Sequence, residues 1–236
     1  GMAWIDANLG VLMKKLKDLG LDKNTLIVFA PDHGSSNKGS LYSQNGCKIP
    51  MIMRWPEQIP AGLQSSAMVQ NIDMVPTFFD MAQAKVPEAY KLHGRSLQPL
   101  FKNGQSSEWR DHLYFEIGSA RAIMNDKYKY IAKRFTDEHI HSIKKSKPLN
   151  LPKLMTPLKK LGIGARGVDH PEFWREDQFY NLKNDPKEMD SLIGHPEYTS
   201  MIKDMKKELT KVLQTMSRPY GEFVPGSDTS GPGQME

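Results

Sequence analysis

The chain has 236 residues, of which 39% are hydrophobic and 25% charged, and its formal net charge is +5. These proportions are typical of a globular protein and exclude a disordered or fibrous chain. No apolar run reaches the roughly 18 residues that a membrane-spanning helix needs, so we expect no membrane segment. The single cysteine, Cys47, excludes an internal disulfide framework and a metal site built from clustered cysteines.

The first part of the chain has the pattern of an α/β layer. Apolar residues recur at helical spacing from Ile5 to Leu19, and Gly20 ends the predicted helix. Residues 25–30 are apolar and rich in β-branched side chains, which predicts a strand buried on both faces and therefore parallel and central in a sheet. A second apolar strand is expected within residues 49–55. A helix is expected to start near Asp73 and to bury Val75, Phe78, Phe79 and Ala82.

The second part predicts a small antiparallel sheet with one long helix. Residues 113–117, 122–124 and 127–131 have strand composition, and the Asn125-Asp126 turn between the last two favours a hairpin. Apolar residues at helical spacing predict a final helix over residues 196–216. The Gly/Pro/Ser-rich tail over residues 217–236 is expected to be mobile unless another part of the chain holds it.

A basic segment lies between Lys133 and Arg166. It holds nine Lys or Arg residues against two acidic ones, a local charge of +7. A solvated surface loop is the simplest interpretation, and a patch for a polyanion is the alternative. No nucleic-acid-binding motif accompanies the segment, so nucleic acid is not an expected partner.

Asp32 and His33 follow the predicted strand over residues 25–30, separated from it by Pro31 alone. Ligands of open α/β sheets bind at the carboxyl ends of strands. A carboxylate suits Ca²⁺ or Mg²⁺, and an imidazole also admits Zn²⁺ or Mn²⁺. The alternative is that Asp32 only caps a following helix. Lys38 lies six residues further on, where its ammonium would suit an anion bound to the same cation, unless it is an ordinary exposed lysine.

Several segments in order resemble the C-terminal half of the sulfatase family, in the alkaline-phosphatase-like superfamily. The first carries Asp32-His33-Gly34 after an apolar strand, and the second is Lys38-Gly39-Ser40-Leu41-Tyr42. The matching segments are residues 26–34, 38–42, 48–56, 71–80, 94–100 and 179–188. The Gly94-Arg95-Ser96-Leu97 motif favours the sulfamidase-like branch.

The resemblance implies a fold and a set of roles. Residues 2–105 would be the trailing part of an alkaline-phosphatase-like α/β core, and residues 106–216 a small α+β subdomain. Asp32 and His33 match the two C-terminal ligands of the family's Ca²⁺. Lys38 matches the catalytic lysine that contacts the sulfate oxygens. Arg121 is a further candidate for binding substrate, with an ordinary surface role as its alternative.

The family's nucleophile motif is not found in this sequence. Sulfatases convert a Cys or Ser in Cys/Ser-x-Pro-x-Arg to formylglycine, and Cys47 does not have that context. We therefore expect a C-terminal portion that has little activity and binds Ca²⁺ weakly by itself, and that self-associates to cover apolar surface.

The parent activity implied by the resemblance is hydrolysis of sulfate esters or N-sulfates of a small molecule or glycan. The compartment implied for that parent family is periplasmic, extracellular or lysosome-like. Two alternatives remain open. One is a non-catalytic module that binds a polyanion or partner, and the other is part of a phosphoester or phosphonate hydrolase.

Overall fold

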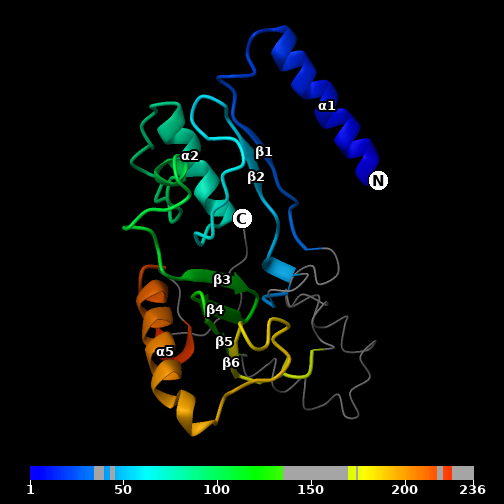
Figure 1. The fold of residues 1–236 in the computed structure, drawn as a ribbon. Helices are drawn as coiled ribbons and strands as arrows, with labels where there is room; N and C mark the ends of the chain where they lie inside the picture. Colours follow the sequence, from blue (N-terminus) through cyan, green and yellow to red (C-terminus); the bar gives the residue numbers. More distant parts are fainter. Residues whose placement is uncertain (35–39, 43–45, 135–169, 174, 217–219, 225–236) are drawn as a thin grey trace. The chain divides into compact units, whose positions relative to one another are not determined.

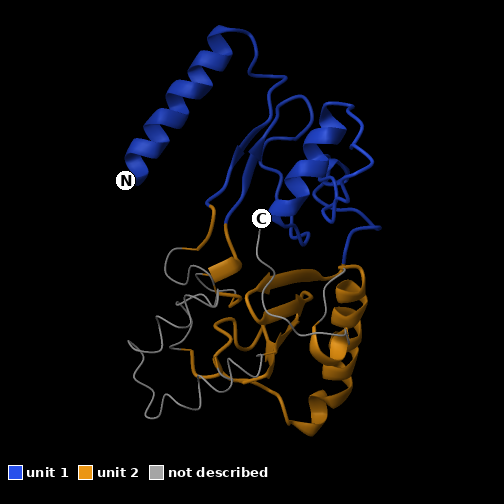
Figure 2. Cartoon of the chain, turned by 180° about the vertical axis from the view of Figure 1, so that it is seen from behind, with its two compact units in different colours: residues 1–31, 50–110 blue, residues 32–49, 111–236 orange. Residues whose placement is uncertain are grey.

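A computed structural model describes residues 1–34, 40–42, 46–134, 170–173, 175–216 and 220–224. The chain divides into two compact units (Figure 2). Unit 1 comprises residues 1–31 and 50–110, and unit 2 comprises residues 32–49 and 111–236. Unit 2 is therefore built from two separate stretches of chain. The predicted domain boundary near residue 105 stays a prediction.

Unit 1 contains two α-helices and a short two-stranded sheet (Figure 1). The helices are α1 (Met2–Asp18) and α2 (Met74–Met81), and the strands are β1 (Ile27–Phe29) and β2 (Ile52–Arg54). The strands pair antiparallel, with Val28 opposite Met53. Among the described residues this corrects the prediction of a parallel, fully buried strand, because β1 is only half-buried.

The predicted buried face of α2 is also wrong. Val75 and Phe78 are exposed, whereas Thr77 is fully buried. The Thr77 hydroxyl donates to the carbonyl of Asp73 at 2.6 Å and accepts from the amide of Leu97 at 2.9 Å. These two bonds satisfy the buried hydroxyl and fix the face of α2 that turns inward.

The core of unit 1 lies around a short 3₁₀ helix, η3 (Gln98–Leu100). Leu97, Leu100 and Phe101 are buried there, and Met53 and Trp55 pack against them. A second 3₁₀ turn, η2 (Asn71–Asp73), leads into α2. Gly94 lies directly against this turn, because a Cβ at Gly94 would be 2.1 Å from the carbonyl oxygen of Ile72.

Apolar side chains are exposed in unit 1. No residue of α1 is buried, and Trp4 and Val11 are 71% and 70% exposed. Exposed apolar surface of this kind favours association, but the predicted homo-oligomer stays a prediction. Among the described residues no helix is both long and apolar enough to cross a membrane.

Unit 2 contains a four-stranded antiparallel sheet in the order β3-β4-β5-β6. The strands are β3 (Leu113–Ile117), β4 (Ala120–Met124), β5 (Tyr128–Lys133) and β6 (Asp177–Asn181). The predicted hairpin is confirmed, because β4 pairs with β5 across a turn in which Asn125 Oδ1 accepts from the amides of Lys127 and Tyr128.

One face of this sheet packs against the long helix α5 (Thr199–Gln214), which follows the 3₁₀ turn η4 (Pro196–Tyr198). Met205, Leu209 and Leu213 of α5 are buried against Ile123, Tyr130 and Phe179, which confirms the predicted final helix. On β5, side chains alternate between the faces. Ile131 belongs to a second core cluster with Leu41, Tyr42 and Tyr180.

Candidate metal-ligand loop and its support

Asp32 and His33 begin the first stretch of unit 2. The Nε2 atom of His33 lies 3.4 Å from Oδ2 of Asp32, well within the distance at which two side chains can share a cation. The carboxylate is 82% exposed and the imidazole 32% exposed, so further ligands can reach both. The two side chains thus lie close together, and the metal role itself stays a prediction.

The backbone sets the orientation of the His33 ring. Nδ1 of His33 lies 2.6 Å from the carbonyl oxygen of Gly34. A carbonyl can only accept, so Nδ1 carries the hydrogen of this bond and the neutral ring has its lone pair on Nε2, the atom that faces Asp32. When one ring nitrogen of a histidine binds a metal, the other ring nitrogen usually donates to a carboxylate, a backbone carbonyl or water, and this bond orients the ring.

The separation of the two side chains fits a shared cation. A charge-assisted hydrogen bond is normally about 2.7–2.9 Å long, which is shorter than the separation found here. Two adjacent ligands about 2.3–2.6 Å from one Ca²⁺ at right angles are about 3.3–3.7 Å apart. Tetrahedral Zn²⁺ gives nearly the same figure, about 3.3–3.4 Å. The separation therefore fits either class of cation.

The described residues supply only part of such a site. Within them, no group of three or more His, Cys, Asp or Glu side chains is arranged to hold a metal ion. Ca²⁺ takes about six to eight oxygen ligands, so Asp32 and His33 need ligands from elsewhere. Lys38 lies outside the described residues.

Arg121 is held at the turn between β3 and β4. Its Nη1 donates to the carbonyl of Gly118 at 2.7 Å, and its Nε lies 3.3 Å from a carboxylate oxygen of Glu116. The guanidinium also covers the ring of Tyr220, 4.9 Å from its centroid. These contacts give Arg121 a role in the sheet, and substrate binding by Arg121 stays a prediction.

The loop that follows Asp32 and His33 is anchored on the sheet by Tyr42. The Tyr42 ring stacks on His170 with the centroids 3.7 Å apart, and its hydroxyl donates to Oε1 of Gln178 at 2.9 Å. Burial raises the pKa of Tyr42, so the hydroxyl keeps its proton and serves as a donor. Tyr42 belongs to the Lys-Gly-x-x-Tyr segment, but its partners could not be read from the sequence.

Two further anchors were not predicted. Lys129 and Glu188 form an ion pair in which both side chains are fully buried, and the Lys129 ammonium also donates to the carbonyl of Leu41. The available signal was weak. Glu188 ends the Asp185-Pro186-Lys187-Glu188 segment of the resemblance, and Lys129 is a charged residue inside the strand β5, between two tyrosines.

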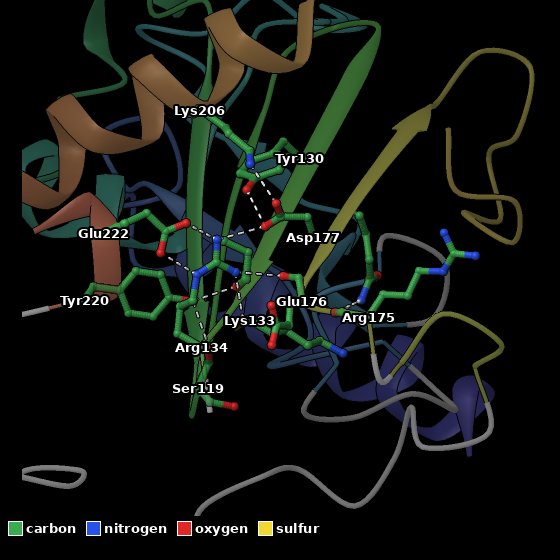
Figure 3. A network of polar contacts seen from close by, with 12 residues as sticks. Ser119, Tyr130, Lys133, Arg134, Arg175, Glu176, Asp177, Lys206, Tyr220 and Glu222 are labelled. Atoms are coloured by element: carbon green, nitrogen blue, oxygen red, sulfur yellow. Dashed lines mark hydrogen bonds and ion pairs between the residues drawn. The ribbon is translucent and has the colours of Figure 1, made fainter. Parts of the chain in front are cut away.

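A separate polar network holds residues 220–224 on the sheet (Figure 3). Arg134 donates from Nε to Glu222 at 2.8 Å and from Nη2 to Asp177 at 2.9 Å. Lys206 and Tyr130 also bond to Asp177, at 2.6 and 2.7 Å. Part of the tail is therefore held, as η5 (Gly221–Phe223), and the remainder of residues 217–236 lies outside the described residues.

The basic segment is described only at its start. Lys133 and Arg134 both turn inward, since Lys133 is buried against Phe173 and Arg134 enters the network around Asp177. The remaining basic residues, from residue 144 to residue 166, lie outside the described residues. For its first two members, the surface-loop interpretation is wrong.

Comparison with protein families gives a match over residues 31–147 to the model of "N-sulphoglucosamine sulphohydrolase, C-terminal". This match includes Asp32, His33, Lys38 and Arg121. It also agrees with the sequence motif at residues 94–97, which favours the sulfamidase-like branch.

Known proteins give the same result over nearly the whole chain. An N-acetylglucosamine-6-O-sulfatase of Bacteroides thetaiotaomicron is 30% identical over 94% of this chain and 35% of its own length. An ulvan-active sulfatase of Formosa agariphila is 32% identical over 89% of this chain and 41% of its own length. The chain thus spans well under half the length of these relatives.

A solved structure shows the same fold. It contains an enzyme in complex with its substrate D-glucosamine-2-N,6-O-disulfate, and it matches with a TM-score of 0.65 and 24% identity over 92% of this chain and 40% of that one. The resemblance found in the sequence motifs is therefore confirmed by relatives, a family model and a fold. The chain is thus similar over residues 31–147 to the C-terminal model of a sulfatase family, and over most of its length to part of known sulfatases.

Proposed function

We propose that this chain supplies the C-terminal part of a sulfatase site that hydrolyses sulfate esters or N-sulfates of a sulfated glycan. The observation that carries the proposal is the arrangement of Asp32 and His33: Nε2 of His33 lies 3.4 Å from Oδ2 of Asp32, while Nδ1 of the same ring lies 2.6 Å from the carbonyl oxygen of Gly34. The family match over residues 31–147 and the two glycan sulfatases among the relatives support the substrate class.

Each residue has a distinct role in this proposal. Asp32 and His33 would supply two ligands to a divalent cation, with Ca²⁺ favoured by the carboxylate. When held there, the cation would supply positive charge beside the sulfate oxygens. Lys38 would place a second positive charge beside those oxygens. Arg121 is the least supported member, because its contacts at the β3–β4 turn already account for it.

The nucleophile has to come from a segment that this sequence does not contain. Cys47 lacks the Cys/Ser-x-Pro-x-Arg context, and a sulfatase needs its formylglycine to form a covalent intermediate. For the 236-residue chain we therefore expect no release of sulfate from an aryl sulfate, with or without Ca²⁺. Turnover that disappears in Lys38→Ala would contradict this division of labour and would require another nucleophile.

The chain offers a matched control for the metal ligands. Asp111 and His112 form a second adjacent Asp-His pair, but there Nδ1 faces the carboxylate at 2.7 Å, and Asp111 is 93% exposed. Paramagnetic Mn²⁺ added to the chain should broaden the imidazole signals of His33 at lower concentration than those of His112. Asp32→Ala should abolish the difference, and Asp111→Ala should leave it unchanged.

Equal broadening at both histidines would contradict the metal-ligand assignment. Such a result would favour the alternative of a non-catalytic module, since the proposed metal ligands Asp32 and His33 would then show no preference for a cation. The measurement needs neither turnover nor the rest of the enzyme.

A further inference from the structure

We infer that Lys129 and Glu188 are positioning residues for the loop that carries Asp32 and His33. The inference rests on the proposed function, because it assigns to a buried ion pair of the sheet the task of holding the candidate metal ligands in place. The pair itself lies on β5 and in the segment after β6, within unit 2.

The first step is the ion pair. Nζ of Lys129 lies 3.3 and 3.2 Å from the two carboxylate oxygens of Glu188, and both side chains are fully buried. A buried ion pair usually gives no more stability than a pair of apolar side chains of similar size. Its presence therefore calls for a task that apolar side chains cannot perform.

The second step is the task. The Lys129 ammonium donates to the backbone carbonyl of Leu41, 88 residues earlier in the chain. An apolar side chain at residue 129 has no donor for this carbonyl, and a buried ammonium needs a counter-charge beside it. Glu188 supplies that counter-charge, and Lys129 fixes the backbone at Leu41.

The backbone of Glu188 gives a second link to the same loop. Nε2 of His170 lies 2.6 Å from the carbonyl oxygen of Glu188, and the His170 ring stacks on Tyr42. Glu188 also has a φ of +59°, a left-handed conformation that glycine adopts more easily than glutamate. A glutamate at such a position indicates that its side chain is needed there.

The third step joins Leu41 and Tyr42 to the candidate ligands. The Cys47 amide donates to the carbonyl of Tyr42 at 3.3 Å, and the Cys47 thiol lies 3.3 Å from the carbonyl of Leu41. The neighbouring residue, Gly46, accepts a hydrogen bond of 2.9 Å from the Gly34 amide. Gly34 in turn supplies the carbonyl that orients His33. The contacts thus run without a break from Glu188 to His33.

The decisive variant separates positioning from stability. Lys129→Met combined with Glu188→Leu replaces the pair by apolar side chains, so the fold should keep its stability while the Leu41 carbonyl loses its charged donor and keeps only the weak thiol donor of Cys47. We expect amide hydrogen exchange of Gly34 and Cys47 to accelerate at least tenfold in this double variant. Exchange of Ile123 and Tyr130, in the β4–β5 ladder, should stay within twofold of the wild-type rate.

Lys206→Met is the matched control, because it removes a lysine from another ion pair of unit 2, with Asp177 at 2.6 Å. It should leave the exchange of Gly34 and Cys47 unchanged. Glu188→Gln, which keeps the size of the side chain, should accelerate amide hydrogen exchange of Gly34 and Cys47. If the double variant does not fold, this single variant tests the inference in its place. Wild-type exchange at Gly34 and Cys47 in a folded variant would overturn the inference.

The same samples keep the two proposals apart. If the inference holds, Mn²⁺ should broaden the His33 signals several-fold less in the double variant than in the wild-type chain. If Mn²⁺ shows no preference for His33 in the wild-type chain, the metal-ligand assignment fails, whereas the exchange rates of Gly34 and Cys47 still report whether Lys129 and Glu188 hold the loop.

Discussion

Arg110 holds the carboxylate of Asp73 through two parallel hydrogen bonds, from Nη1 at 2.9 Å and from Nη2 at 2.6 Å. Asp73 is fully buried, and its oxygens also accept from the backbone amides of Gln70 and Arg95, at 2.7 and 2.8 Å. One carboxylate therefore joins the start of α2, the segment after Gly94 and the end of unit 1. The residue that the sequence suggested as a helix start is the centre of a network.

Removal of this carboxylate should cost unit 1 much of its stability. Asp73→Ala leaves the buried Arg110 charge and two backbone amides without their partner, so the free energy of unfolding should fall by about 3–5 kcal/mol. Chemical denaturation measures the change. Asp80→Ala, at an exposed position of α2, is the control and should change stability by less than about 0.5 kcal/mol. A loss below 1 kcal/mol for Asp73→Ala, on the order of a surface pair, would contradict the prediction.

Lys133 should give the stability of unit 2 a distinct pH dependence. Burial lowers the pKa of Lys133 to about 7, although the Phe173 ring, 3.8 Å from Nζ, favours the ammonium. Between pH 7 and the ordinary lysine pKa, the unfolded chain binds one more proton at this residue than the folded chain. The free energy of unfolding therefore rises with pH in this window and loses that gain as the pH falls to 7.

Lys133→Met should remove this slope. Relative to the variant, the wild-type chain should gain about 2 kcal/mol of stability between pH 7 and pH 9. Denaturant titrations at the two pH values measure the gain. Lys207→Met, at an exposed position of α5, should follow the wild-type curve. Parallel curves for Lys133→Met and the wild-type chain would show that Lys133 keeps an ordinary pKa in the folded state.

Shortening one apolar side chain to alanine should destabilise the protein strongly in α5 and very little in α1. Leu209 of α5 is fully buried, so Leu209→Ala should lower the free energy of unfolding by about 2–5 kcal/mol, through lost burial and the cavity left behind. Val11 of α1 is 70% exposed, so Val11→Ala should change it by no more than about 0.5 kcal/mol. Thermal or chemical unfolding measures both. A comparable loss for Val11→Ala would show that α1 has a packing partner in solution.

The elements that the sequence predicted well depend on local signals. The β4–β5 hairpin follows from Asn125, whose side chain bonds to the two following amides within the same turn. The inward face of α5 follows from regular apolar spacing over four turns. In residues 25–30 the apolar run lacks any alternation, so it could not distinguish a buried parallel strand from the half-buried antiparallel one that forms.

In the candidate site too, features that depend on neighbouring residues could be predicted from the sequence, and features that depend on distant segments could not. Asp32 and His33 are adjacent in the chain, so their proximity required no knowledge of the fold. The partners of Tyr42 depend on how distant segments pair, since Gln178 lies 136 residues away. Lys129 and Arg134 are charged residues whose usual place is the surface, and only the packing of β5 against its neighbours shows that they turn inward.

The composition of unit 2 from residues 32–49 and 111–236 has a consequence during synthesis. When the ribosome has made Asp32, His33 and Tyr42, the strands that hold them do not yet exist. The hydrogen bond of Tyr42 cannot form before Gln178 has been synthesised, and that of the Leu41 carbonyl cannot form before Lys129 has been synthesised. The contacts of this loop that are most distant in sequence therefore form last. The nascent loop and the apolar residues Leu41 and Tyr42 stay without their core until β6 has emerged, which makes this interval the one most open to aggregation or to a chaperone.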